Sequence, residues 1–167
     1  LSQDEKTLYI SNSRDLEIVN ITDLKSPRLI SSNKSEVFTE EFSGLTKYSR
    51  TSMALNEKTK TLFIGGVGLQ VYDVSNLTKP ILLQGFQNEL IEVEDKNLIF
   101  QRNDLHLSHQ NDGQQVLLIA NGTLDIYNIS NPREMKLIKS FPTQSSPRSI
   151  FRSQFSSNIL FLLGTNE

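Results

Sequence analysis

The hydrophobic positions of this chain recur in three similar segments that align almost without gaps. Each segment opens with a short apolar run, such as Leu62-Phe63-Ile64, which is typical of a strand buried on both faces. After a short turn, apolar and polar residues alternate with the period of two that indicates a second strand. A third strand follows a polar turn. The segments are TLYISNSRDLEIVNITDLKSPRLI from Thr7, TLFIGGVGLQVYDVSNLTKPILL from Thr61 and VLLIANGTLDIYNISNPREMKLI from Val116.

These patterns predict an all-β chain with four short strands in each repeat. A further strand precedes each segment and is expected to be the innermost of its sheet. Asp73 and Asn76 suit the turn before the third strand, because short polar side chains can hydrogen-bond backbone amides two residues further on. The expected strands are 52–55, 61–65, 69–74 and 80–84 in one copy, with equivalents at 7–10, 16–20 and 27–31, and at 105–107, 116–120, 124–129 and 136–141.

The spacing of the repeats favours a β-propeller. A fourth copy begins with ILFLLG, and the equivalent residues Leu8, Leu62, Leu117 and Leu160 are separated by 54, 55 and 43 residues. The last spacing is close to the roughly 40–45 residues of a plain four-stranded blade. We therefore expect about three blades and the start of a fourth, cut from a larger propeller. The expected units are 1–53, with a truncated first strand and an insertion near 34–50, 54–104, with an insertion near 87–103, 105–148, and 149–167 as the start of the next blade.

The repeat motif resembles that of a known family. Each copy follows the pattern L-ϕ-ϕ, a short Gly or Asn turn, L-x-ϕ-x-D-ϕ-S-N, and then proline and an apolar strand, most closely in VYDVSNLTKPILL. This pattern is similar to the LVIVP repeat. The resemblance implies a propeller in a large microbial protein, often at the cell surface, that serves as a binding or scaffolding platform without catalytic residues. WD repeats fit less well because the chain has no Trp. Kelch repeats, which carry a double glycine in each copy, fit less well because Gly65-Gly66 occurs once.

Composition narrows the range of functions. The net charge of −2 is spread along the chain, so no basic face for nucleic acid is expected. No apolar run approaches the roughly 18 residues of a membrane span. The chain has no cysteine, which excludes disulfides, thiolate metal sites and cysteine nucleophiles. The expected partners are other blades or domains of the same polypeptide, together with a protein partner.

The chain offers little catalytic or metal-binding chemistry. His106 and His109 lie near Asp104 and Asp112, and two histidines with a carboxylate can bind zinc, but the four residues need not converge. The acidic clusters at 4–5, 40–41 and 92–95 lack the spacing of a calcium loop. We therefore expect no catalytic residue, no cofactor and no metal ligand.

Two other functions remain open besides an extracellular interaction module. In a propeller hydrolase or lactonase, ligands would come from equivalent positions of several blades. Those positions hold Ser11, Gly65 and Ala120, or Arg14, Val67 and Gly122, which are not ligand sets. A cytoplasmic assembly scaffold differs from the extracellular module mainly in compartment. The full-length sequence would discriminate between the two.

Three groups of residues give specific expectations. Asn-x-Ser/Thr sequons favour a secreted or cell-surface setting, and Asn33 and Asn121 are expected to be the most accessible. The sequons are at Asn20, Asn33, Asn76, Asn121 and Asn128. Apolar residues of the two insertions are expected to contact a partner or to cover a blade edge, namely Phe38, Phe42, Tyr48, Leu90, Ile91, Val93 and Phe100. Residues expected to be almost free of solvent are Leu8, Ile10, Leu62, Ile64, Leu117 and Ile119.

Overall fold

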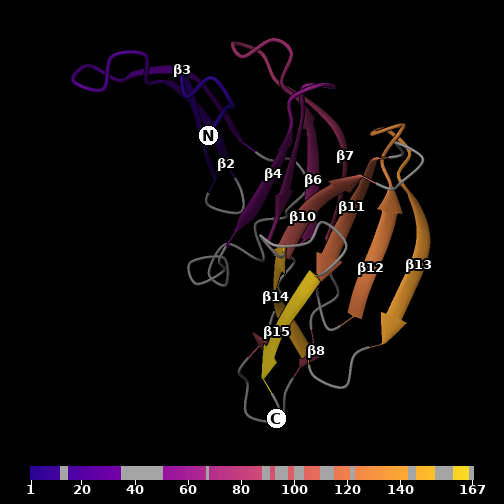
Figure 1. Cartoon of the computed structure of the whole chain (residues 1–167). Coiled ribbons are helices and arrows are strands. Elements are labelled where there is room, and N and C mark those ends of the chain that lie inside the picture. Colours follow the sequence, from indigo (N-terminus) through magenta and orange to yellow (C-terminus); the bar gives the residue numbers. More distant parts are fainter. Residues whose placement is uncertain are drawn as a thin grey trace.

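The computed structural model is all-β, and its described residues form antiparallel sheets without a helix (Figure 1). Three sheets follow one another along the chain, and two short hairpins accompany them. The described residues are 1–11, 15–34, 51–66, 68–87, 91–92, 98–99, 104–109, 115–120, 123–142, 146–152 and 160–165.

The first sheet has three strands and the next two have four each. In every sheet the strand order follows the sequence, as expected from the repeat. The first sheet contains β1 (Thr7–Ser11), β2 (Asp15–Asn20) and β3 (Arg28–Lys34). The second contains β4 (Ser52–Asn56), β5 (Thr61–Gly65), β6 (Gly68–Asp73) and β7 (Ile81–Gln87). The third contains β10 (Asp104–His109), β11 (Gln115–Ala120), β12 (Thr123–Asn128) and β13 (Lys136–Pro142).

Two hairpins lie outside these sheets. Strands β8 (Ile91–Glu92) and β9 (Leu98–Ile99) pair within the second predicted insertion. Strands β14 (Ser146–Arg152) and β15 (Leu160–Thr165) correspond to the fourth copy of the repeat. The first strands of successive sheets lie side by side, β4 next to β10 and β10 next to β14, as expected of innermost strands.

The same irregularity marks the last strand pair of each sheet. The pairing register shifts after Ile18, after Val71 and after Ile126, which are equivalent positions of the three repeats. Each shift leaves one residue of the outer strand without an opposite partner, as in a β-bulge. In the first two sheets this residue is Ile30 or Leu83, and it packs into an apolar cluster. The bulge is therefore part of the repeat.

Matching turns also recur before the outer strands. The oxygen Oδ1 of Asp73 accepts a hydrogen bond from the Ser75 amide, and that of Asn76 accepts one from the Thr78 amide. This confirms the predicted role of Asp73 and Asn76. The equivalent bonds form in the other sheets, from Thr22 to Asn20, from Lys25 to Asp23, from Ser130 to Asn128 and from Arg133 to Asn131.

The sheets pack face to face in sequence order. We call the face that packs on the preceding sheet the leading face, and the opposite one the trailing face. The leading face of the second sheet packs on the trailing face of the first, and that of the third on the trailing face of the second. The first junction joins Leu62, Ile64, Tyr72 and Val74 to Tyr9, Leu16 and Ile18. The second joins Leu117, Ile119 and Ile129 to Phe63, Leu69 and Val71.

The burial prediction is confirmed for two sheets and wrong for the first. Leu62, Ile64, Leu117 and Ile119 are at most 2% exposed, whereas Ile10 is 42% exposed. Leu8 is only half-buried. The reason is that both residues lie on the leading face of the first sheet, which no other sheet of the described chain covers.

Candidate functional site: the cleft at the first junction

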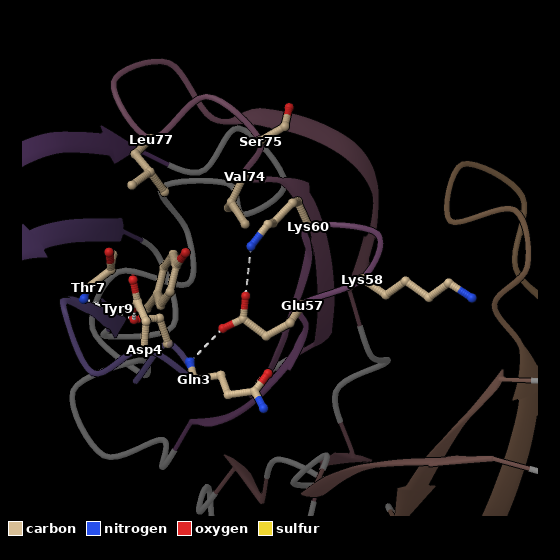
Figure 2. Close-up of a pocket in the computed structure, with 11 residues that line it drawn as sticks. Gln3, Asp4, Thr7, Tyr9, Glu57, Lys58, Lys60, Val74, Ser75 and Leu77 are labelled. Carbon is tan, nitrogen blue, oxygen red and sulfur yellow. Dashed lines mark hydrogen bonds and ion pairs between the residues drawn. The ribbon is translucent and has the colours of Figure 1, made fainter.

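An open cleft of about 700 Å³ lies where the first sheet meets the second. Two turns form its rim, one at residues 2–6 and the other at residues 57–60 (Figure 2). Tyr9, Val74 and Leu77 supply its apolar lining, and the turns supply charged side chains. The cleft therefore combines an apolar wall with a polar rim, as small binding sites do.

A hydrogen bond to Glu57 holds the two turns to each other. The Glu57 carboxylate accepts a bond of 2.7 Å from the Gln3 amide at Oε1 and one of 2.9 Å from Lys60 Nζ at Oε2. These bonds, the Lys60 bond first, hold the pKa of Glu57 below its ordinary value. Glu57 therefore connects the first sheet to the second while ionised.

Asp4 is the second carboxylate of the cleft. Its Oδ1 accepts hydrogen bonds from Ser2 Oγ at 2.7 Å and from the Lys6 amide at 3.2 Å. The Ser2 bond is the main cause that lowers the pKa of Asp4, and the Lys6 bond adds to it. No residue of the described ranges forms a salt bridge with Asp4.

Tyr9 presents a phenol to this cleft. The residue is only 7% exposed. Burial raises its pKa, and the charges of Glu57 and Asp4 raise it further, so that the phenol keeps its proton. Within the described part of the chain the hydroxyl has no hydrogen-bond partner. At the equivalent positions the second sheet has Phe63 and the third has Leu118, so only the first junction carries a hydroxyl here.

Sequence reasoning missed this cleft. The available signal lay in the repeat alignment, where Tyr9 stands at the position that Phe63 and Leu118 occupy in the other two copies. The pairing of Gln3 with Glu57 was not visible, because it depends on how two sheets pack.

The residues considered for metal binding lie in and beside β10. Asp104 begins this strand, His106 lies within it and His109 ends it, whereas Asp112 lies outside the described residues. His109 is paired with Gln115 across the hairpin. No group of three metal-binding side chains occurs in the described ranges.

The sequons occupy different environments. Asn20 and Asn76 are exposed, and Asn128 is half-buried; the side-chain oxygen of each closes a turn. Asn33 was expected to be among the most accessible, but it lies in β3, and its Nδ2 is buried without a hydrogen-bond partner. Asn121 lies outside the described residues.

Most of the predicted contact residues of the insertions lie outside the residues that the structure describes. Ile91 lies in the short strand β8. The others fall outside the described residues, namely Phe38, Phe42, Tyr48, Leu90, Val93 and Phe100. The described part of the chain contains no helix long and apolar enough to cross a membrane.

Comparison with known families identifies the repeat. Residues 62–87 and 117–143 match the model of the LVIVD repeat. These segments are LVIVD repeats. Each begins at the buried leucine of the sheet's second strand and extends to its outer strand, β7 or β13. The resemblance inferred from the VYDVSN-type motif is thereby confirmed.

Other comparisons add little. Among solved structures, the chain is similar to a functionally unknown protein from Desulfotomaculum acetoxidans, with 12% sequence identity and a TM-score of 0.40. The alignment covers 95% of this chain and 58% of that protein, so the chain spans less than two thirds of that protein's length. The search of curated proteins found no match.

Proposed function

We propose that this chain is a non-enzymatic part of a β-propeller, with three blades and the start of a fourth, that acts as an interaction or structural scaffold. Propellers close with four to eight blades. The proposal rests mainly on the uncovered leading face of the first sheet. That face carries apolar side chains at the positions that join the sheets elsewhere in the chain.

The open face follows from the register of the first sheet. Leu8 pairs with Val19, and Val19 pairs with Leu29, so these residues share one face with Ile10. Leu29 is 61% exposed. Its equivalent in the second sheet, Leu82, packs against the first junction. A face of this kind on a soluble domain marks a surface that another element covers.

Association of the chain in solution tests this proposal. We expect the wild-type chain to self-associate with increasing concentration in sedimentation equilibrium and to bind a hydrophobic dye, because the face is open. The double substitution Ile10→Ser and Leu29→Ser should reduce both effects. Leu24→Ser is the matched control, since Leu24 is 79% exposed but lies in a turn outside this face. Unchanged association in the double variant, or a wild-type chain that stays monomeric at all concentrations, would disprove the role of the face.

We further propose that the scaffold belongs to a secreted or cell-surface protein. The exposed sequons at Asn20 and Asn76 support this setting, because N-linked sugar requires an accessible acceptor. Mass spectrometry of the protein from its native source should find sugar on at least one of these two residues. Unmodified peptides at both would favour the cytoplasmic alternative.

A further inference from the structure

We propose that the sheet which covers the leading face of the first sheet presents a lysine or arginine side chain to Glu17. This inference rests on the proposed function, because it takes another sheet of the repeat to close this face, and it adds the chemistry which that sheet must carry. Both junctions within the chain pack a leading face against the trailing face of such a sheet. In Figure 1 the first sheet lies at one end of the row of sheets.

Glu17 lies on the leading face of β2. Its neighbours Leu16 and Ile18 are buried in the first junction on the trailing face, so the alternation of the strand turns Glu17 to the opposite side. There it is half-buried, because the face is open. Gln70 and Asp125 occupy the same register position in the second and third sheets. A polar residue therefore recurs at this position of the three leading faces.

Both covered sheets supply this polar residue with hydrogen-bond donors of their own. Gln70 is only 2% exposed beneath the first sheet, and its Oε1 accepts a hydrogen bond of 3.0 Å from the Tyr72 hydroxyl. Asp125 remains half-buried, and its Oδ1 accepts hydrogen bonds from the hydroxyl groups of Thr123 and Ser140. Covering a leading face can therefore bury this position almost completely, and the side chain then needs a donor.

The first sheet does not provide such donors. The positions of the tyrosine and threonine donors hold Val19, which has no polar group, and Asp15, whose carboxylate only accepts. Ser32 pairs with Glu17 across the strands but forms no side-chain hydrogen bond with it. Among the described residues, the Glu17 side chain has neither a hydrogen bond nor a salt bridge. The donor must therefore come from the covering sheet.

The charges on this face favour a basic donor. The face carries Asp15, Glu17 and Lys34, and the lysine stands opposite Asp15 in the register rather than opposite Glu17. The three equivalent residues of the second sheet are uncharged. Covering the first sheet would thus enclose a net negative charge, and burying a carboxylate is costly unless a cation pairs with it. The ammonium of lysine and the guanidinium of arginine both carry N–H donors and a positive charge.

Two substitutions of Glu17 test this proposal in the protein as its native host assembles it. Glu17→Gln keeps an acceptor and removes the charge, whereas Glu17→Met keeps the approximate size and removes both. If a basic side chain pairs with Glu17, the thermal midpoint should fall by about 5 °C in Glu17→Gln and further in Glu17→Met, because the partner cation is left buried and unpaired. Glu5→Gln is the matched control, since Glu5 is exposed in the turn before β1 and its loss should leave the midpoint unchanged.

The order of the three midpoints separates the outcomes. A midpoint that rises from wild type to Glu17→Gln and Glu17→Met would mean that a sheet without a donor covers the face. That result would overturn this proposal and leave the scaffold proposal intact. A loss confined to Glu17→Met would indicate an uncharged donor and would also overturn it. Equal midpoints in all three proteins would mean that Glu17 stays in water, which would contradict the proposed closure of the face as well.

Discussion

The first and second sheets share a sequence pattern but differ in environment. In the second sheet both faces are covered, and Leu62, Phe63 and Ile64 are all at most 2% exposed. In the first sheet Tyr9 is buried, whereas the neighbouring Ile10 is 42% exposed. The leading-face residues are alike in the two sheets, so the difference comes from the neighbours. Each repeat contributes half of two junctions, and stability depends on the junctions that are complete.

The largest expected effect separates these two environments. Leu62→Ala should lower the free energy of unfolding by about 2–5 kcal/mol, because it leaves a cavity in a closed junction. Ile10→Ala in the first sheet should lower it by less than about 1 kcal/mol, since its side chain is already in contact with water. Urea denaturation of the two variants measures both values. A loss below about half a kilocalorie per mole for Leu62→Ala would show that β5 is not packed between two sheets.

The turns that precede β1 and β5 give the next comparison. In the second sheet, Asn56 Nδ2 donates a hydrogen bond of 2.6 Å to Gln115 Oε1 of the third sheet. Asn56 Oδ1 accepts hydrogen bonds from the amides of Lys58 and Thr59. Ser2 occupies the equivalent position in the first sheet and accepts a bond from the Thr7 amide. Both residues are buried.

Asn56→Ala should therefore destabilise the chain more than Ser2→Ala, by about 1–3 kcal/mol against about 1 kcal/mol. The reason is that Asn56 joins two sheets and closes a turn, whereas the bonds of Ser2 remain within its own turn. A double-mutant cycle of Asn56→Ala with Gln115→Ala isolates the bond between the sheets. Additive losses would mean that this bond contributes nothing.

The sequence predicted the strands well, because their signals are local. The apolar run of β5, the alternation of β6 and the paired Asx turns each lie within a few residues of chain. The exposure of Ile10 could not be predicted in this way, because it depends on whether another sheet covers the face. The cleft depends on a contact between residues 3 and 57, which no local pattern contains. The sequence therefore predicts a repeat more reliably than it predicts the surfaces between and beyond the repeats.

A smaller effect is expected from the hydrogen bonds that outer strands form with the following sheet. Ser31 Oγ donates to the Leu77 carbonyl oxygen at 2.7 Å across the first junction. The equivalent Gln84 accepts a bond from the Met135 amide across the second junction, at 3.3 Å. Ser31→Ala should lower stability by about 1 kcal/mol, the usual contribution of one hydrogen bond. Ser32→Ala, at an exposed position of the same strand, should have almost no effect. Equal losses in the two serine variants would contradict a role for the bond across the junction.

The smallest expected effect is a dependence on pH at the first junction. The pKa of Glu57 is lower in the folded chain than its ordinary value of 4.5, mainly because Lys60 bonds to the carboxylate. At acidic pH the unfolded chain therefore binds more protons at this residue than the folded chain does, and stability rises with pH. The contribution is fully present above the ordinary value and is lost as the pH falls below it through the folded pKa.

Glu57→Gln tests this assignment. The glutamine keeps an oxygen that can accept from the Gln3 amide but cannot be ionised, so the variant should show a shallower fall in stability between about pH 5 and pH 3. The change should be small and should shrink with added salt, because Glu57 and Lys60 are both partly exposed. Urea midpoints measured across this range for the wild type and the variant provide the comparison. If both show the same acid slope, the hydrogen bonds of the Glu57 carboxylate do not couple its protonation to folding.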